Sequence, residues 1–199
     1  MRVLVACEYS GKVRDAFTAL GHEAWSCDIL PSESKGKHIQ GDVLDMLGGF
    51  CGGEWDVLLA FPPCTYLTVS ANKWYKDQPK RPSGALVGAE RREAREQAKG
   101  FFMALMNAPI DKIAIENPIG IMSTQYRKPD QVVQPWMFGH GETKATCLWL
   151  KGLPKLEPTN IVDGREQRMH LMTPSVDRAK KRSETYTGVA NAMASQWGK

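Results

Sequence analysis

The sequence lacks the cysteine and histidine groupings that indicate a disulfide framework or a zinc site. Its 199 residues include five cysteines and four histidines. The cysteine count is odd, no two cysteines have the spacing Cys-x-x-Cys, and no histidines form His-x-x-x-His or His-Glu-x-x-His. We therefore expect free thiols and no metal. Free thiols are typical of a reducing compartment such as the cytoplasm.

Long apolar runs are also absent. The longest, such as residues 56–64, are much shorter than a membrane-spanning helix, which needs about 20 apolar residues. The chain does not begin with the basic, apolar and small-residue pattern of a signal peptide. Hydrophobic residues make up 42% and charged residues 24%, which is typical of a globular domain. The net charge of +4 permits a nucleic-acid partner without requiring one.

Short apolar runs alternate with amphipathic segments through the N-terminal half. The pattern predicts strands at residues 2–7, 23–27, 56–60 and 112–115, and helices at 12–20 and 89–107. This alternation indicates an α/β fold with a parallel sheet and helices on both faces. Residues 31–40 and 71–88 are expected to be loops, 42–47 one or two helical turns, 144–150 a strand, and 183–197 a helix.

Polar or reactive residues come shortly after four of these expected strands. These residues are 8–11, Asp28, Cys64 and Glu116. In open parallel sheets, ligands bind beyond the carboxyl ends of the strands. The convergence therefore predicts a ligand site at that edge of the sheet.

Cys64 and Glu116 together suggest a specific chemistry. Two prolines stiffen the turn before Cys64, although a buried structural cysteine explains that position equally well. Glu116 alone is more simply an exposed carboxylate. As a pair, a thiol and a neutral acid are what a pyrimidine ring needs. Attack by a thiolate at C6, with an acid at N3, makes C5 carbanion-like and able to accept a sulfonium methyl group.

At this point the sequence resembles the DNA cytosine-5 methyltransferases, specifically their short phage-type members. Pro62-Pro63-Cys64 is similar to the family's Pro-Cys motif, and Glu116-Asn117-Pro118 to its Glu-Asn-Val motif. The resemblance implies a Rossmann-like S-adenosylmethionine-dependent methyltransferase fold, with a mostly parallel twisted sheet and helices on both faces. It implies Cys64 as the nucleophile and Glu116 as the contact to N3 and the 4-amino group of cytosine. The implied location is the cytoplasm of a bacterium or phage-infected host cell.

The same resemblance implies a set of residues that bind S-adenosylmethionine. The turn after the first strand corresponds to the family's methionine-binding loop, although Gly11 stands alone where two or three glycines are usual. Asp28 is placed at the ribose. Asp42 is placed at the adenine amino group, or else begins a helix as its N-cap. The full implied set is Glu8, Tyr9, Ser10, Gly11, Asp28, Ile29, Asp42, Pro62 and Asn191.

The chain departs from the family in two places. Residues 151–182, about thirty in number, stand where the family has a large target-recognition domain, so we expect a single catalytic domain over residues 1–199. The family's Gln-x-Arg-x-Arg motif is absent. Lys144 is the candidate to replace the arginine that contacts the cytosine O2, which makes it a third expected catalytic residue.

Two basic stretches are candidates for contacts with DNA. One includes aromatic side chains, which suit an extruded or single-stranded base, and the other could lie along a duplex backbone. A solvated run of charges is an equally good interpretation of each. The candidate contacts are Lys73, Trp74, Lys76 and Arg81 in the first stretch, and Arg178, Lys180, Lys181 and Arg182 in the second.

Two further hypotheses remain open from the sequence. The first keeps the fold but changes the reaction, so that the protein modifies C5 of a free pyrimidine nucleotide or uses another sulfonium or one-carbon donor. The second is a non-catalytic DNA-binding homologue, which the single glycine of the cofactor loop and the missing arginine motif favour.

Overall fold

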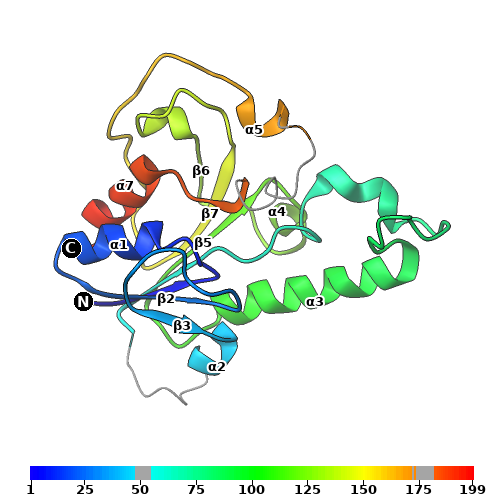
Figure 1. Ribbon diagram of the computed structural model, residues 1–199, viewed down its shortest axis with the longest axis horizontal. Helices are drawn as coiled ribbons and strands as arrows, with labels where there is room; N and C mark the ends of the chain where they lie inside the picture. Colours follow the sequence, from blue (N-terminus) through cyan, green and yellow to red (C-terminus); the bar gives the residue numbers. More distant parts are fainter. Residues whose placement is uncertain (48–54, 172, 174–181) are drawn as a thin grey trace.

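A computed structural model describes residues 1–47, 55–171, 173 and 182–199 (Figure 1). Its strands form one seven-stranded sheet in the order β3-β2-β1-β4-β5-β7-β6. The strands are β1 (Arg2–Ala6), β2 (Glu23–Asp28), β3 (His38–Gln40), β4 (Val57–Ala60), β5 (Lys112–Pro118), β6 (Gln131–Val133) and β7 (Thr146–Lys151). The helices are α1 (Lys12–Ala19), α2 (Val43–Leu47), η1 (Val69–Tyr75), α3 (Gly88–Met106), α4 (Met122–Gln125), η2 (Pro135–Met137), α5 (Arg168–Leu171) and α7 (Thr187–Trp197).

Strands β1 to β5 are parallel to one another, and β7 runs antiparallel to both β5 and β6. The central strands are continuous apolar runs because both faces of the sheet are covered. Val3, Leu4 and Val5 of β1, for example, are completely buried. The predicted α/β fold with a mostly parallel sheet is confirmed.

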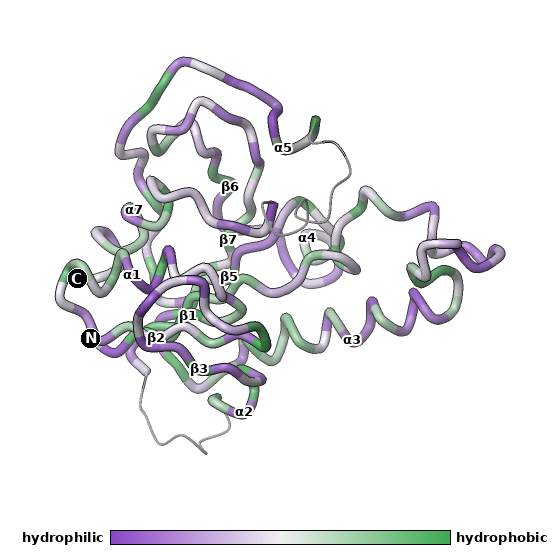
Figure 2. The backbone as a smooth tube through the Cα atoms, viewed as in Figure 1, coloured by the Kyte–Doolittle hydropathy of each residue, from purple (hydrophilic) through white to green (hydrophobic). Residues whose placement is uncertain are grey.

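Helices cover both faces of the sheet (Figure 1). One face packs against α1 and α7 through side chains such as Phe17, Met193 and Trp197. The other face packs against α2 and α3 through Val43, Phe102 and Leu105. Figure 2 shows the apolar strands at the centre and a mainly hydrophilic outer end of α3 with the connection that precedes it. That outer end extends away from the sheet.

Three expectations from the sequence are corrected. The segment 31–40 is not all loop, because residues His38–Gln40 pair with β2 as an additional strand. The segment 71–88 is not all loop either, because residues 71–75 belong to the 3-10 helix η1. Glu116 does not follow a strand, because β5 continues to Pro118 by pairing with β7. Local patterns missed β3 and the end of β5 because each is formed by pairing with a strand that is distant in the sequence.

The order of the strands creates a reversal between β1 and β4. From β1 the chain adds β2 and β3 on one side, and from β4 it adds β5 on the other. Such a reversal leaves a crevice beyond the carboxyl ends of the two central strands, where open α/β sheets bind their ligands. In this chain, the two segments that border the reversal are the turn after β1 and the Pro62-Pro63-Cys64 turn after β4.

Candidate active site

Cys64 lies in a tight turn beyond the end of β4. Its carbonyl oxygen accepts hydrogen bonds from the backbone N–H groups of Leu67 and Thr68, both at 3.0 Å. Pro62 is buried at the start of this turn, whereas Cys64 is exposed. The turn therefore places Cys64 at the surface, at the reversal of strand order, while neighbouring groups partly bury its thiol.

Glu116 lies inside β5, opposite Leu148 of β7. Burial raises the pKa of its carboxyl group above the ordinary 4.5, while the Lys144 charge and a hydrogen bond with the Thr146 side chain act in the opposite direction. Burial is the largest of these effects, so the net shift is toward the neutral acid. The carboxyl group lies within the strand and not after it.

The structure brings Cys64, Glu116, Lys144 and Arg182 within electrostatic reach of one another. Burial raises the pKa of the Cys64 thiol above its ordinary 9.0, and the Glu116 charge raises it further. The positive charges of Lys144 and Arg182 lower it. Glu116 and Lys144 also line a small pocket together with Phe61, three residues before Cys64. A thiol, a carboxyl group and an ammonium group thus lie near one another at one edge of the sheet.

The segments that carry Cys64 and Glu116 are joined directly. The buried Asn117 side chain donates from Nδ2 to the carbonyl oxygen of Pro62 at 2.9 Å. Farther along, Thr68 and Gly120 form an antiparallel bridge. A Cβ atom on Gly120 would overlap the Leu67 carbonyl oxygen, so only glycine permits this approach. These roles of Asn117 and Gly120 were not predicted, because they depend on the second segment.

Tyr186 is a further pocket residue that sequence reasoning did not single out. Its hydroxyl donates to Glu142 Oε2, and its ring lies 5.9 Å from Lys144 Nζ. Lys144 Nζ also donates to the Glu184 carbonyl oxygen at 3.3 Å. The segment before α7 is therefore held against the pocket.

The turn after β1 is shaped by contacts within the protein. The Glu8 carboxylate accepts hydrogen bonds from the N–H groups of Val13 at 2.7 Å and Arg14 at 3.2 Å, at the start of α1. Ser10 Oγ donates to the same carboxylate at 3.4 Å. The Tyr9 hydroxyl bonds with Ser183 Oγ at 3.1 Å. Glu8 and Ser10 therefore stabilise the start of a helix.

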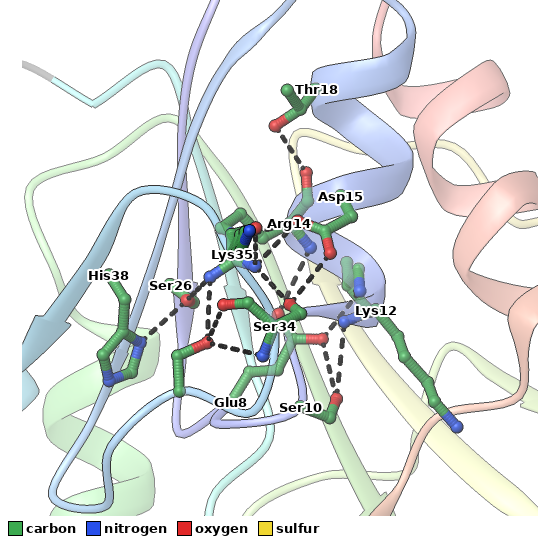
Figure 3. Close-up of polar contacts among 12 residues, drawn as sticks. Glu8, Ser10, Lys12, Arg14, Asp15, Thr18, Ser26, Ser34, Lys35 and His38 are labelled. Atoms are coloured by element: carbon green, nitrogen blue, oxygen red, sulfur yellow. Dashed lines mark hydrogen bonds and ion pairs between the residues drawn. The ribbon is translucent and has the colours of Figure 1, made fainter.

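A buried arginine, Arg14, holds the connection between β2 and β3 against α1 (Figure 3). Its guanidinium group donates to three serine hydroxyls and one backbone carbonyl, which belong to Ser26, Ser32, Ser34 and Lys35. Gly11, at φ 74°, leaves room for this network, since a Cβ atom there would overlap Ser34 and Arg14. Nothing in the amphipathic pattern of residues 12–20 indicated that Arg14 is buried.

Asp28 is the last residue of β2, and Asp42 lies between β3 and α2. Burial, followed by the charges of Asp28, Cys27 and Asp42, raises the pKa of the Cys7 thiol to about 12. Asp28 Oδ1 accepts from the Leu30 N–H at 2.9 Å, and Asp42 Oδ1 accepts from the Leu44 N–H at 2.9 Å, at the start of α2. The N-cap interpretation of Asp42 thus describes its observed contact.

Two other expected cofactor residues have contrasting positions. Ile29, directly after β2, is 74% exposed and presents an apolar surface next to Asp28. Asn191 is an exposed residue of α7, the helix that packs against α1.

Residues 65–99, which we call the arm, extend from the Cys64 turn through η1 and back along α3. Arginines of α3 hold its base. Arg91 Nη2 donates to the Thr65 carbonyl oxygen at 3.2 Å, and Arg95 Nε to that of Tyr66 at 2.9 Å. The Arg95 guanidinium also lies 3.3 Å from the centre of the Tyr75 ring. The arm is thus built directly onto the residues that follow Cys64.

The arm carries the positive charge excess of the chain. It contains eight Lys or Arg and four Asp or Glu residues, an excess of four that equals the formal net charge of the whole protein. Lys73 Nζ and the Arg81 guanidinium lie 4.8 and 4.0 Å from the Trp74 ring centre, and Lys76 is exposed nearby. In the second basic stretch, Arg182 is described and exposed, whereas Arg178, Lys180 and Lys181 lie outside the described residues.

Within the described part of the chain, no group of three or more His, Cys, Asp or Glu residues is arranged to hold a metal ion. No described helix has the length and apolar character needed to cross a membrane.

Comparison with known proteins bears on the fold. No protein-family model matches the sequence, and no curated protein matches it. A crystal structure of an E. coli prophage-encoded protein, described as a candidate DNA modification methyltransferase, matches with a TM-score of 0.50 and 14% sequence identity. The match covers 88% of this chain.

The chain has a Rossmann-like methyltransferase fold. The matched part spans 56% of the E. coli chain, so this protein corresponds to little more than half of that one. At 14% identity the likeness concerns the fold, and the chemistry must be argued from the site itself.

Proposed function

We propose that this protein transfers a methyl group from S-adenosylmethionine to C5 of cytosine in DNA, through a covalent bond between Cys64 Sγ and C6. The observation that carries the proposal is the meeting of Cys64 with Glu116. An exposed thiol and a carboxyl group whose pKa is raised by burial lie within electrostatic reach across the ends of β4 and β5. The prophage-encoded protein of similar fold supports the same class of reaction.

The residues of the site can perform each part of this chemistry. The Cys64 thiolate adds to C6, and the electron pair of the C5–C6 double bond moves toward C5. Neutral Glu116 donates a hydrogen bond to N3 and stabilises the charge that develops on the ring. Lys144 lowers the pKa of Cys64 and so favours its thiolate. After transfer, loss of the C5 proton and cleavage of the C6–sulfur bond restore the ring and the thiolate.

The crevice beyond β1 and β2 fits S-adenosylmethionine in part. The cofactor supplies a methyl group made electrophilic by a positively charged sulfur. Asp28 keeps one carboxylate oxygen that no described residue bonds, which suits the ribose hydroxyls, and Ile29 offers an exposed surface for the adenine ring. The Glu8 carboxylate instead accepts hydrogen bonds from N–H groups at the start of α1. We therefore assign Glu8 to shaping the turn and not to binding the cofactor.

The proposed DNA substrate rests on the arm. Its excess of positive charge begins next to the nucleophile, where it would neutralise phosphates on either side of a target cytosine. The base must leave a duplex to reach Cys64, or else be presented in a single strand. We propose a single catalytic domain in which residues 151–182 replace a target-recognition domain and the arm supplies much of the DNA contact.

The deciding experiment is a nucleoside mass spectrum. The protein is incubated with S-adenosylmethionine and cytosine-containing DNA, single-stranded or duplex, or with dCMP, and the products are digested to nucleosides. 5-Methylcytosine from DNA is expected. Methylated dCMP, or a cytosine of another mass, would favour the nucleotide-modifying or other-donor hypothesis.

The covalent step is tested with Cys64→Ser and a matched control, Cys147→Ser, which replaces a buried thiol of β7. Cys64→Ser should lose all methyl transfer and retain cofactor binding by calorimetry, whereas Cys147→Ser should keep turnover. DNA that carries 5-fluorocytosine should form a lasting adduct with Cys64. The fluorine at C5 takes the place of the proton whose loss lets the C6–sulfur bond break. Methylation by Cys64→Ser would exclude the mechanism. An absence of cofactor binding by the unaltered protein at millimolar concentration would favour the non-catalytic hypothesis.

A further inference from the structure

Two exposed apolar side chains, Val69 and Ile119, flank the proposed active site. Val69 is 45% exposed and follows Cys64 by five residues; Ile119 is 54% exposed and follows Glu116 by three. A single exposed apolar residue needs no explanation, but two that lie together beside a catalytic pair are informative.

The backbone holds these two side chains next to each other. Thr68 and Gly120 form an antiparallel bridge, and the Ile121 N–H donates to the Leu67 carbonyl oxygen at 2.8 Å. In an antiparallel register, the position after Thr68 faces the position before Gly120, so Val69 lies opposite Ile119. On the inner side of the bridge, Leu67 and Ile121 are buried. The apolar surface of the core thus continues outward and ends at Val69 and Ile119.

We infer that Val69 and Ile119 form an apolar edge that packs against the bases next to the target cytosine and fills the space it leaves in the stack. This inference rests on the proposed function. Proteins that distort DNA commonly insert apolar side chains between base pairs, and an enzyme that extrudes a base must offset a few kcal/mol of lost stacking. Val69 and Ile119 lie where such a contact is needed.

The surroundings of the edge favour nucleic acid over a second copy of this chain. Val69 is the first residue of η1, which continues into Lys73, Trp74 and Lys76 of the arm. The apolar edge is therefore continuous with the arm and its excess of positive charge. Two copies that met through this edge would bring two such arms together and repel each other. A DNA strand matches both the apolar edge and the positive charge.

The test compares three DNA substrates that contain the same target cytosine. They are a single strand, a fully paired duplex, and a duplex in which the target faces an abasic site. Val69→Ser combined with Ile119→Ser should lower kcat/KM on the paired duplex by about tenfold or more, which corresponds to ~1.4 kcal/mol of lost stabilisation. Its activity on the single strand should stay within about twofold of the unaltered protein, since no stack must be opened there.

Leu20→Ser is the matched control, because Leu20 is also 54% exposed but lies at the end of α1. It should leave all three activities unchanged. Equal losses on all three substrates, or no loss on the paired duplex, would overturn the inference. So would an unaltered protein that acts on single strands alone, or a dimer in sedimentation that the double substitution dissociates. An unaltered protein that methylates no DNA would overturn the proposed function itself, and the inference with it.

Discussion

Asn117 Nδ2 donates a 2.9 Å hydrogen bond to the carbonyl oxygen of Pro62, and this buried contact joins the segment of the acid to that of the nucleophile. Glu116 precedes Asn117, and Cys64 lies two residues after Pro62. This side-chain amide, together with the pairing of β4 with β5 and the Thr68–Gly120 bridge, therefore helps to set the distance between the carboxyl and the thiol.

Replacing this amide should affect the site more than the fold. We expect Asn117→Ala to cost about 1–3 kcal/mol of unfolding free energy in urea, because a buried carbonyl loses its partner. The rate at which iodoacetamide alkylates Cys64, followed by peptide mass spectrometry, should also change. Gln131→Ala is the matched control, since Gln131 makes a comparable pair of bonds with the backbone of Leu156. It should lower stability and leave Cys64 alkylation unaltered; equal effects of both variants on Cys64 would contradict the prediction.

The charges around Cys64 predict how its reactivity depends on pH. The Glu116 charge raises the pKa of Cys64, and the Lys144 charge lowers it. In the pH range where Glu116 is ionised, Glu116→Gln should therefore shift the rise of alkylation rate with pH to lower pH, and Lys144→Met should shift it to higher pH. Since a pKa shift of one unit changes the thiolate fraction about tenfold below the pKa, a shift of half a unit gives ~3-fold. Buried Cys27 and Cys147 serve as internal controls. Shifts of the same sign in both variants would refute this electrostatic account.

The Arg14 network should be important for stability. Its fully buried guanidinium group donates to five oxygen acceptors, one of which is the Asp15 carboxylate. We expect Arg14→Met to reduce the unfolding free energy in urea by at least ~2 kcal/mol, because hydrogen bonds to a charged group are removed and buried hydroxyls lose their partner. Arg2→Met, which removes an exposed ion pair with Glu23 at 3.7 Å, should change it by less than about 1 kcal/mol. Comparable losses in the two variants would show that the network adds little.

The arm should account for the salt dependence of DNA binding. With Lys73, Lys76 and Arg81 all replaced by Gln, the slope of log affinity against log salt should become shallower by about 0.7–0.9 for each phosphate that these side chains neutralise. Fluorescence anisotropy with a labelled oligonucleotide measures this slope. Replacing three exposed lysines outside the arm, Lys128, Lys155 and Lys199, leaves the same net charge. An equal change of slope in this control would mean that overall charge, and not the arm, determines binding.

The sequence predicted the elements whose signals are local. Strands β1, β4 and β5 are short apolar runs, and α3 has the apolar period of an amphipathic helix. Both signals are visible in the sequence itself. The short strand β3 and the continuation of β5 through Glu116 escaped prediction, because each exists only by pairing with β2 or β7. The candidate catalytic residues Cys64 and Glu116 were found by chemical type, whereas Tyr186 and Asn117 owe their roles to tertiary contacts.

The amino-acid sequence by itself determined which chemical groups the site contains. They are a thiol after two prolines, a carboxyl group beside an apolar run, and a basic, aromatic segment between them. Only the tertiary structure decided that burial raises the pKa of Glu116, that Lys144 lies near it, and that Gly120 lets two segments meet. The physical reason is that burial and electrostatic reach depend on distances between groups far apart in the chain, which strand pairing sets and local sequence does not.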